Sequence, residues 1–254
     1  MDYQHISFQV ASGVTRLTLN RPPLNVLNIA MMREINLALD GLDQATTKVL
    51  VLSAEGKAFS AGVDVAEHTA DKVGEMIEVF HGVFRRLERL DVPTLAIVQG
   101  AALGGGCEVA LFCDLVLASD KAKFGQPEIK VGVLPPIAAV MLPRLVPHKK
   151  ALELLLMGET IDAAEAHRLG LVNRVVPADQ LQAATDEMIG KLAALSGVVL
   201  RMTRRAARLG GQGTFGEALG QVESLYLDEL MKTHDANEGL TAFLEKRPPV
   251  WKDQ

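Results

Sequence analysis

The chain has 254 residues, of which 48% are hydrophobic, and it carries a formal net charge of −5 at pH 7. Such a chain can bury a large core, either as one domain or as a domain with an appendage. It has neither a basic excess nor a long block of like charge, so a nucleic-acid partner is not expected.

Strand-like and helical patterns alternate through residue 120, which favours an α/β fold followed by an all-helical C-terminal part. Apolar runs and turn signals predict strands over residues 6–10, 14–19, 48–52, 94–98, 115–118 and 171–175. Helical spacing predicts helices after Asn28, after Thr69, from the glycines at 104–106, and over 137–145, 149–157 and 163–168. After Pro177 the chain is predicted to be helical almost to its end, with a break at 210–213.

Compartment signals are few. Residues 1–10 lack a basic region followed by an apolar run, so no signal peptide is predicted and a cytoplasmic protein is expected. The apolar stretch 92–118 contains Glu108 and is broken by glycines, which favours a strand, a turn and a helix of a buried core over a membrane span. Cys107 and Cys113 are predicted to be buried thiols in a reducing compartment, and no spacing of Cys and His is typical of a metal site.

The stretch around Glu108 is the strongest candidate for chemistry. Three glycines at 104–106 follow the strand predicted over 94–98 and open a helix. Glycine suits a sharp bend or a close approach of a ligand to the backbone. The first N–H groups of a helix are unpaired, and together with the positive end of the helix dipole they can receive a developing negative charge. Glu108 in the first turn, and Glu128 after Pro127, would supply acid and base beside such a site.

Each candidate side chain also has a structural interpretation. Glu108 can be a first-turn glutamate stabilised by the helix dipole, and Glu128 a surface acid. Asp64 either caps a turn or shapes a loop of the active site. His68 is either exposed before a helix or faces a pocket. Arginines at positions 201, 204, 205 and 208 share one helical face, which is expected to be solvated, with contact to a ligand phosphate as the alternative.

Five segments resemble, in order, signatures of the crotonase (enoyl-CoA hydratase/isomerase) superfamily. They are residues 20–27, 56–65, 104–108, 124–128 and 235–246. The first resembles the opening signature of the family, and the second resembles its coenzyme A and first oxyanion segment. The next two resemble its hydratase-type glutamate segments, and the last resembles its C-terminal helix. On this order of segments the chain is identified as a member of the superfamily.

The resemblance implies an α/β fold in which a crotonase-like spiral of ββα units forms two sheets. The spiral core, with the coenzyme A site and the active site, is expected over residues 1–195. A C-terminal α-helical region over residues 196–254 is expected to pack a homotrimer, or a dimer of trimers, and to close the coenzyme A site. No membrane partner, metal or separate cofactor is implied, because coenzyme A is part of the substrate.

The resemblance also implies the roles of individual residues. Glu108 would be the base that orients a water, Glu128 would be the acid, and the backbone N–H groups of Val63 and Gly105 would hold the thioester oxygen. The positions expected to bind the substrate and coenzyme A are Leu24, Val26, Ala58, Ser60, Ala61, Gly62, Asp64, Val65, Leu103, Gly104, Pro127, Val133, Pro136 and Lys246. Of these, Lys246 would reach the coenzyme A phosphates of a neighbouring subunit.

Because both glutamates are present, the resemblance implies a hydro-lyase that adds water to an α,β-unsaturated acyl-CoA thioester. Prolines at 135 and 136 depart from the glycines of the usual pattern and stiffen one wall of the acyl pocket. With the segment 62–69, they resemble the cyclohexa-1,5-diene-1-carbonyl-CoA hydratases of anaerobic aromatic degradation. The alternatives are a simple 2-enoyl-CoA hydratase, an enoyl-CoA isomerase and, more remotely, a non-catalytic scaffold that binds coenzyme A or RNA.

Overall fold

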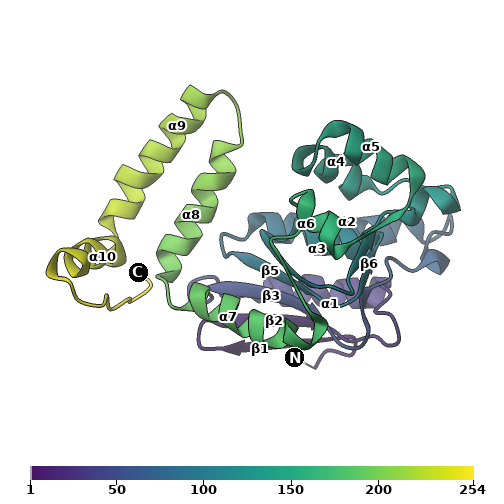
Figure 1. The fold of residues 1–254 in the computed structure, drawn as a ribbon, viewed down its shortest axis with the longest axis horizontal. Helices are drawn as coiled ribbons and strands as arrows, with labels where there is room; N and C mark the ends of the chain where they lie inside the picture. The colour runs from purple at the N-terminus through teal and green to yellow at the C-terminus, as the bar shows by residue number, and fades with distance from the viewer. Residues whose placement is uncertain (1) are drawn as a thin grey trace.

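The computed structural model describes residues 2–254, and its strands form two sheets (Figure 1). The six-stranded sheet has the order β1 (Ile6–Ala11), β2 (Val14–Leu19), β3 (Val49–Ala54), β5 (Thr94–Val98), β7 (Leu115–Ser119) and β10 (Arg174–Val176). The four-stranded sheet has the order β4 (Ala58–Ser60), β6 (Ala101–Leu103), β8 (Lys123–Gly125) and β9 (Thr160–Asp162).

From β3 to β8, consecutive strands alternate between the two sheets. Each of β3, β5 and β7 in the large sheet is followed along the chain by β4, β6 or β8 in the small one. Within each sheet these neighbours pair in parallel, and antiparallel pairing occurs at the edges, between β1 and β2 and between β8 and β9. The α/β spiral of ββα units predicted from the sequence is therefore confirmed.

The described residues form ten α-helices. They are α1 (Ile29–Asp40), α2 (Val73–Arg89), α3 (Gly105–Phe112), α4 (Pro136–Leu145), α5 (His148–Met157), α6 (Ala163–Arg168), α7 (Leu181–Ala193), α8 (Gly197–Gly210), α9 (Phe215–Ser224) and α10 (His234–Glu245). Two short 3-10 turns, η1 (Val65–Glu67) and η2 (Pro127–Val131), flank the site described below. No helix within residues 2–254 is long and apolar enough to cross a membrane, and the stretch 92–118 contributes β5, β6, α3 and most of β7.

The large sheet is covered on both faces. Leu50 and Leu52 of β3 belong to the main core, in which α1 and α2 also take part. Val49 and Val51 point the opposite way and pack with Ile189 of α7. Successive side chains of a strand point to opposite faces, so a strand buried on both faces is apolar at every position. This explains why β3 begins with an unbroken apolar run.

The C-terminal helices form an arm. Figure 1 shows α8 and α9 as a hairpin that stands away from the sheets, with α10 near its base. The Arg204 side chain, only 10% exposed, donates from Nε to Asp114 Oδ2 over 2.7 Å and also donates to the Leu90 carbonyl. The expected solvated arginine stripe is therefore wrong at Arg204, which fastens the arm to the core.

Candidate active site

A pocket of about 610 Å³ lies between α2, the start of α3 and η2. Its walls are largely apolar, with a few titratable side chains among glycines and aliphatic groups. The lining residues are Ala61, Gly62, Val63, Val65, His68, Val73, Met76, Ile77, Phe80, Gly104, Gly105, Glu108, Pro127, Glu128, Lys130, Val131, Gly132, Val133, Leu134, Pro135 and Pro136. A cavity of this size and character is typical of a site for a small organic group.

Glu108 projects from the first turn of α3 and is 1% exposed. Its Oε1 atom accepts a 2.7 Å hydrogen bond from the backbone N–H of Ala138. This N–H belongs to the first turn of α4, where Pro136 at the start has no N–H to offer and the following amides are free for the carboxylate. The helix end therefore fixes one oxygen of Glu108.

Burial is the main influence on the pKa of the Glu108 carboxyl group. It raises the pKa of the carboxyl group to about 8, and the nearby Glu128 charge adds to the rise, against the opposing hydrogen bond from Ala138. Such a group can exchange a proton near neutral pH, as acid–base catalysis requires.

Glu128 lies in η2 and reaches the same pocket. Burial raises the pKa of its carboxyl group as well. Its Oε2 atom is buried and has no hydrogen-bond partner among residues 2–254. A buried carboxylate oxygen without a partner is costly unless a ligand or a proton satisfies it. Near neutral pH the two glutamates therefore hold at least one proton between them.

Val63 and Gly105 meet at the floor of the pocket. A Cβ atom on Gly105 would stand 2.6 Å from Val63 Cγ2, so only glycine allows this approach. Leu27 pairs with the neighbours of Val63, accepting from Asp64 N over 2.9 Å and donating to Gly62 O over 2.8 Å. In a parallel bridge this pattern leaves the N–H of Val63 on the opposite side. The N–H of Gly105, in the first helical turn, has no partner within α3.

Eleven of the residues expected at the site line the pocket together. They are Ala61, Gly62, Val63, Val65, Gly104, Gly105, Glu108, Pro127, Glu128, Val133 and Pro136. The structure thus brings both glutamates, Val63 and Gly105 to one cavity.

Three of the expected residues lie beneath the pocket and support it. Ala58 and Ser60 are buried in β4, and Ser60 Oγ donates to the Asn25 carbonyl over 2.7 Å and accepts from Gly62 N over 3.2 Å. The Asp64 side chain caps η1, accepting from Ala66 N over 3.1 Å. Of the two interpretations of Asp64, the structure thus shows the cap of a turn.

The remaining expected residues lie outside the pocket. The Leu24 carbonyl accepts a 2.9 Å hydrogen bond from the backbone N–H of Ala61, a residue that lines the pocket. Leu103 lies in β6, with its carbonyl against Gly62. Lys246 is exposed at the end of α10, and Figure 1 shows α10 on the other side of the molecule from α3. Within one chain, Lys246 therefore does not take part in this pocket.

One wall of the pocket was not predicted from the sequence. Val73, Met76, Ile77 and Phe80 of α2 line the pocket, although their helical spacing predicts only an apolar face. Pro135 and Pro136 also line the pocket. His68, for which the sequence left two interpretations, also lines the pocket.

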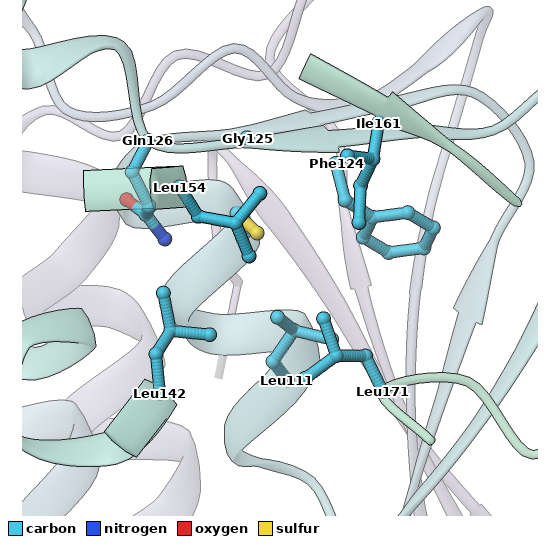
Figure 2. A pocket seen from close by; sticks show the side chains of 9 residues that line it. Leu111, Phe124, Gly125, Gln126, Leu142, Leu154, Ile161 and Leu171 are labelled. Atoms are coloured by element: carbon cyan, nitrogen blue, oxygen red, sulfur yellow. The ribbon is translucent and has the colours of Figure 1, made fainter. Parts of the chain in front are cut away.

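A second cavity lies on the far side of α3 (Figure 2). Its volume is about 10 Å³, room for at most a single water and too small for an acyl group. Figure 2 shows the Gln126 amide beside Leu142 and Leu154. Cys107, which also lines this cavity, and Cys113 are free and buried, as predicted. No group of His, Cys, Asp and Glu side chains within residues 2–254 could hold a metal ion.

Comparison with known proteins gives consistent matches over the whole chain. A family model described as enoyl-CoA hydratase/isomerase matches residues 9–254. The cyclohexa-1,5-dienecarbonyl-CoA hydratase of Thauera aromatica is 43% identical over 247 residues, covering 95% of this chain and 94% of the relative. A probable enoyl-CoA hydratase of Mycobacterium bovis is 39% identical over 253 residues, covering 98% of each. The solved enoyl-CoA hydratase subunit I of Geobacillus kaustophilus is 35% identical, with a TM-score of 0.93 and 100% of both chains covered.

Proposed function

Because the chain belongs to the enoyl-CoA hydratase/isomerase family and is a hydratase-type lyase, we propose that its substrate is the cyclic dienoyl thioester cyclohexa-1,5-diene-1-carbonyl-CoA. The observation that supports water addition is that two carboxyl groups, those of Glu108 and Glu128, line one largely apolar cavity together with Val63 and Gly105. Water addition to a conjugated thioester needs these parts: a receptor for negative charge, a base and an acid.

The backbone N–H groups of Val63 and Gly105 are the proposed receptor for the thioester oxygen. Negative charge grows on this oxygen when a nucleophile attacks the conjugated carbon chain. Removing one such donor costs about 3 kcal/mol of transition-state stabilisation in comparable sites. The Gly105 amide also lies at the positive end of α3, which strengthens the interaction.

Glu108 and Glu128 are the proposed proton carriers. Water is a poor nucleophile, so an ionised carboxylate must take its proton as the C–O bond forms. The other group, still protonated, then delivers a proton to the carbon next to the thioester. Since burial raises the pKa of both groups, one of them can remain protonated near neutral pH.

The shape and chemistry of the pocket support a cyclic acyl group. Apolar side chains line the pocket beside the glutamates. They are Val73, Met76, Ile77 and Phe80 of α2, together with Pro135 and Pro136. A six-membered carbon ring offers apolar surface on both faces, which such walls can bury. The cyclic dienoyl substrate named for the Thauera aromatica relative has this form.

Kinetics on two substrates tests the proposal. Purified protein should hydrate cyclohexa-1,5-diene-1-carbonyl-CoA with a higher kcat/KM than crotonyl-CoA, measured by loss of the enoyl-thioester absorbance. A clear preference for crotonyl-CoA would instead identify a simple 2-enoyl-CoA hydratase, a function supported by the Mycobacterium bovis relative. A product with a shifted double bond and no added hydroxyl group would identify an isomerase.

The arm supports the proposal of a homotrimer or a dimer of trimers. It carries large apolar side chains in solvent: Phe215 is 83%, Phe243 82% and Leu244 80% exposed. Clusters of exposed apolar side chains commonly mark protein interfaces. In such an assembly Lys246, at the end of α10, would approach the coenzyme A phosphates of a neighbouring subunit. Light scattering that finds a monomer would contradict this assembly.

A further inference from the structure

The loop that carries Val63 packs directly against the start of α3. A Cβ atom on Gly106 would stand 2.6 Å from Ser60 Cβ. A Cβ on Gly105 would stand 2.6 Å from Val63 Cγ2, and one on Gly62 would stand 3.7 Å from Gly105 N. The loop and the helix thus approach more closely than side chains at the α3 glycines would allow. The position of the loop therefore determines how far the N–H of Val63 lies from that of Gly105.

The Ser60 hydroxyl group holds this loop from within. Ser60 is 0% exposed and does not line the pocket. Its Oγ donates to the Asn25 carbonyl over 2.7 Å and accepts from Gly62 N over 3.2 Å. Gly62 directly precedes Val63, so the second of these hydrogen bonds acts on the neighbouring peptide unit. Loss of the hydroxyl would leave one donor and one acceptor of the buried backbone without this partner.

Asn25 supplies a fixed acceptor for the hydroxyl. It is 1% exposed, and its φ of 50° lies in the left-handed region, which asparagine adopts more readily than most residues. Its Nδ2 donates to the carbonyls of Glu55 and Ala58 over 2.8 and 2.9 Å. Its Oδ1 accepts from Arg21 N over 2.8 Å. Because both ends of the side-chain amide are bonded, the Asn25 carbonyl cannot turn away from Ser60 without breaking these bonds.

The other backbone hydrogen bonds of the loop hold its opposite edge. Leu27 N donates to Gly62 O over 2.8 Å, and Asp64 N donates to Leu27 O over 2.9 Å. These bonds run to the segment before α1 and away from α3. Ser60 Oγ lies on the α3 side, 2.8 Å from where a Cβ on Gly106 would stand. The hydroxyl group is therefore placed where the loop meets the helix.

We propose that Ser60, held by Asn25, is a positioning residue that sets the distance between the backbone amides of Val63 and Gly105. The inference rests on the proposed hydratase function, in which these two amides receive the thioester oxygen. Two donors stabilise one oxygen only if both lie about 2.7–3.1 Å from it. Without the Ser60 hydroxyl, the loop relaxes away from α3 and one donor moves out of this range. Ser60 itself touches no substrate, because it is sealed beneath the pocket.

Infrared spectra of bound butyryl-CoA, labelled with carbon-13 at the thioester carbonyl, test the proposal without turnover. Butyryl-CoA is saturated and adds no water, and hydrogen bonds to its carbonyl oxygen lower the C=O stretching frequency. The wild-type protein should lower this frequency relative to free butyryl-CoA. Ser60→Ala should lower it by only about half as much, because one of two donors recedes.

Hydration kinetics with a matched control separates positioning from stability. In Ser60→Ala we expect kcat to fall about 10-fold, with little change in KM, because the amides stabilise the transition state more than the ground state. The control is Thr15→Val. Thr15 is also 0% exposed, its Oγ1 lies 2.9 Å from Thr47 Oγ1, and it does not line the pocket. Thr15→Val should lower the melting temperature and leave kcat and the carbonyl band at their wild-type values.

Each result decides the role of Ser60. A Ser60→Ala band at the wild-type frequency overturns the proposal, and so does an equal displacement in Thr15→Val. If Ser60→Ala does not fold, Ser60→Cys takes its place, since a thiol is only a weak donor and acceptor. Its band should lie between those of the wild type and free butyryl-CoA, and a wild-type band again overturns the proposal.

The band also separates this inference from the proposed function. A wild-type protein that lowers the carbonyl frequency but hydrates no enoyl-CoA refutes the hydratase function, while the band in Ser60→Ala still decides the positioning role. A wild-type protein that binds butyryl-CoA without lowering the frequency refutes the proposed receptor and the role of Ser60 together.

Discussion

Replacing Gly104 with alanine is expected to displace the Glu128 carboxylate while leaving both glutamates in the chain. A Cβ atom at position 104 would stand 2.5 Å from Glu128 Oε1, whereas ordinary contact begins at about 3.4 Å. The carboxylate must therefore retreat by about 0.9 Å. A displacement of about 1 Å can lower a rate about 100-fold, or about 2.7 kcal/mol in activation free energy. We expect kcat for hydration, followed by the enoyl-thioester absorbance, to fall by about this factor.

The same substitution strains the backbone, so a control is needed. Gly104 has φ 51° and ψ −129°, a conformation that costs a residue with a side chain about 1–3 kcal/mol. Gly170 also has a positive φ, of 80°, but a Cβ there would meet nothing within 4 Å. Gly170→Ala should therefore lower the melting temperature and leave kcat unchanged. A folded Gly104→Ala variant with the kcat of the wild type would refute the placement of Glu128 by Gly104.

Glu108→Gln and Glu128→Gln should each lower kcat about 10²–10⁴-fold without loss of fold, and a variant with wild-type kcat would exclude that residue from proton transfer. Burial raises the pKa of Glu108 from 4.5 to about 8, so its ionisation destabilises the folded state increasingly as pH rises between these values. Glu108→Gln should therefore raise Tm, relative to the wild type, more near about pH 9 than near about pH 5, and equal shifts would contradict this. Arg204→Ala should lower the free energy of unfolding by about 2 kcal/mol, since Arg204 is buried against Asp114. Arg205→Ala, the control, removes an exposed ion pair and should lower the free energy of unfolding by less than about 1 kcal/mol, measured by urea denaturation. If both variants lower the free energy of unfolding equally, Arg204 does not hold the arm to the core.

The strands of the large sheet are predicted better from the sequence than those of the small sheet, because they are longer. Strands β3, β5 and β7 have five or six residues, at least four of them apolar, and each is predicted close to its observed bounds. The strands of the small sheet have three residues each, too few for any periodicity to identify them. The observed strand β10 begins at Arg174, three residues after the start of the strand predicted over 171–175. Leu171 and Val172 are instead buried in the core outside the sheet.

The C-terminal part shows the same limit. The predicted break at 210–213 is confirmed, since α8 ends at Gly210 and Thr214 caps α9. A second interruption, the π-helical turn Leu225–Glu229, was not predicted. It depends on how successive turns of the backbone bond to one another and leaves no mark in residue type.

The residues of the candidate site that act through their chemical type could be predicted from the sequence. The residues that only form a wall of the pocket could not. Glu108 and the glycines before it can be identified from the chemistry they suit. The spacing of Val73, Met76, Ile77 and Phe80 predicts an apolar face on α2, but the same face serves a packed core and a cavity wall equally well. Only the position of η2 opposite α2 makes that face a wall.

The glycine run is explained by the crowding around α3 rather than by helix formation, which glycine disfavours. A Cβ on Gly105 or on Gly106 would stand 2.6 Å from a side-chain atom of the segment 60–63, and one on Gly104 would stand 2.5 Å from Glu128. Each of the three positions thus faces a different obstacle, and any side chain would push the helix away from the loop or from the glutamate. The first-turn amides reach the pocket only because α3 lies in direct contact with both. The local sequence therefore gives up helix propensity, about 1 kcal/mol for each of Gly105 and Gly106, and so brings the start of α3 and the two acidic side chains to one cavity.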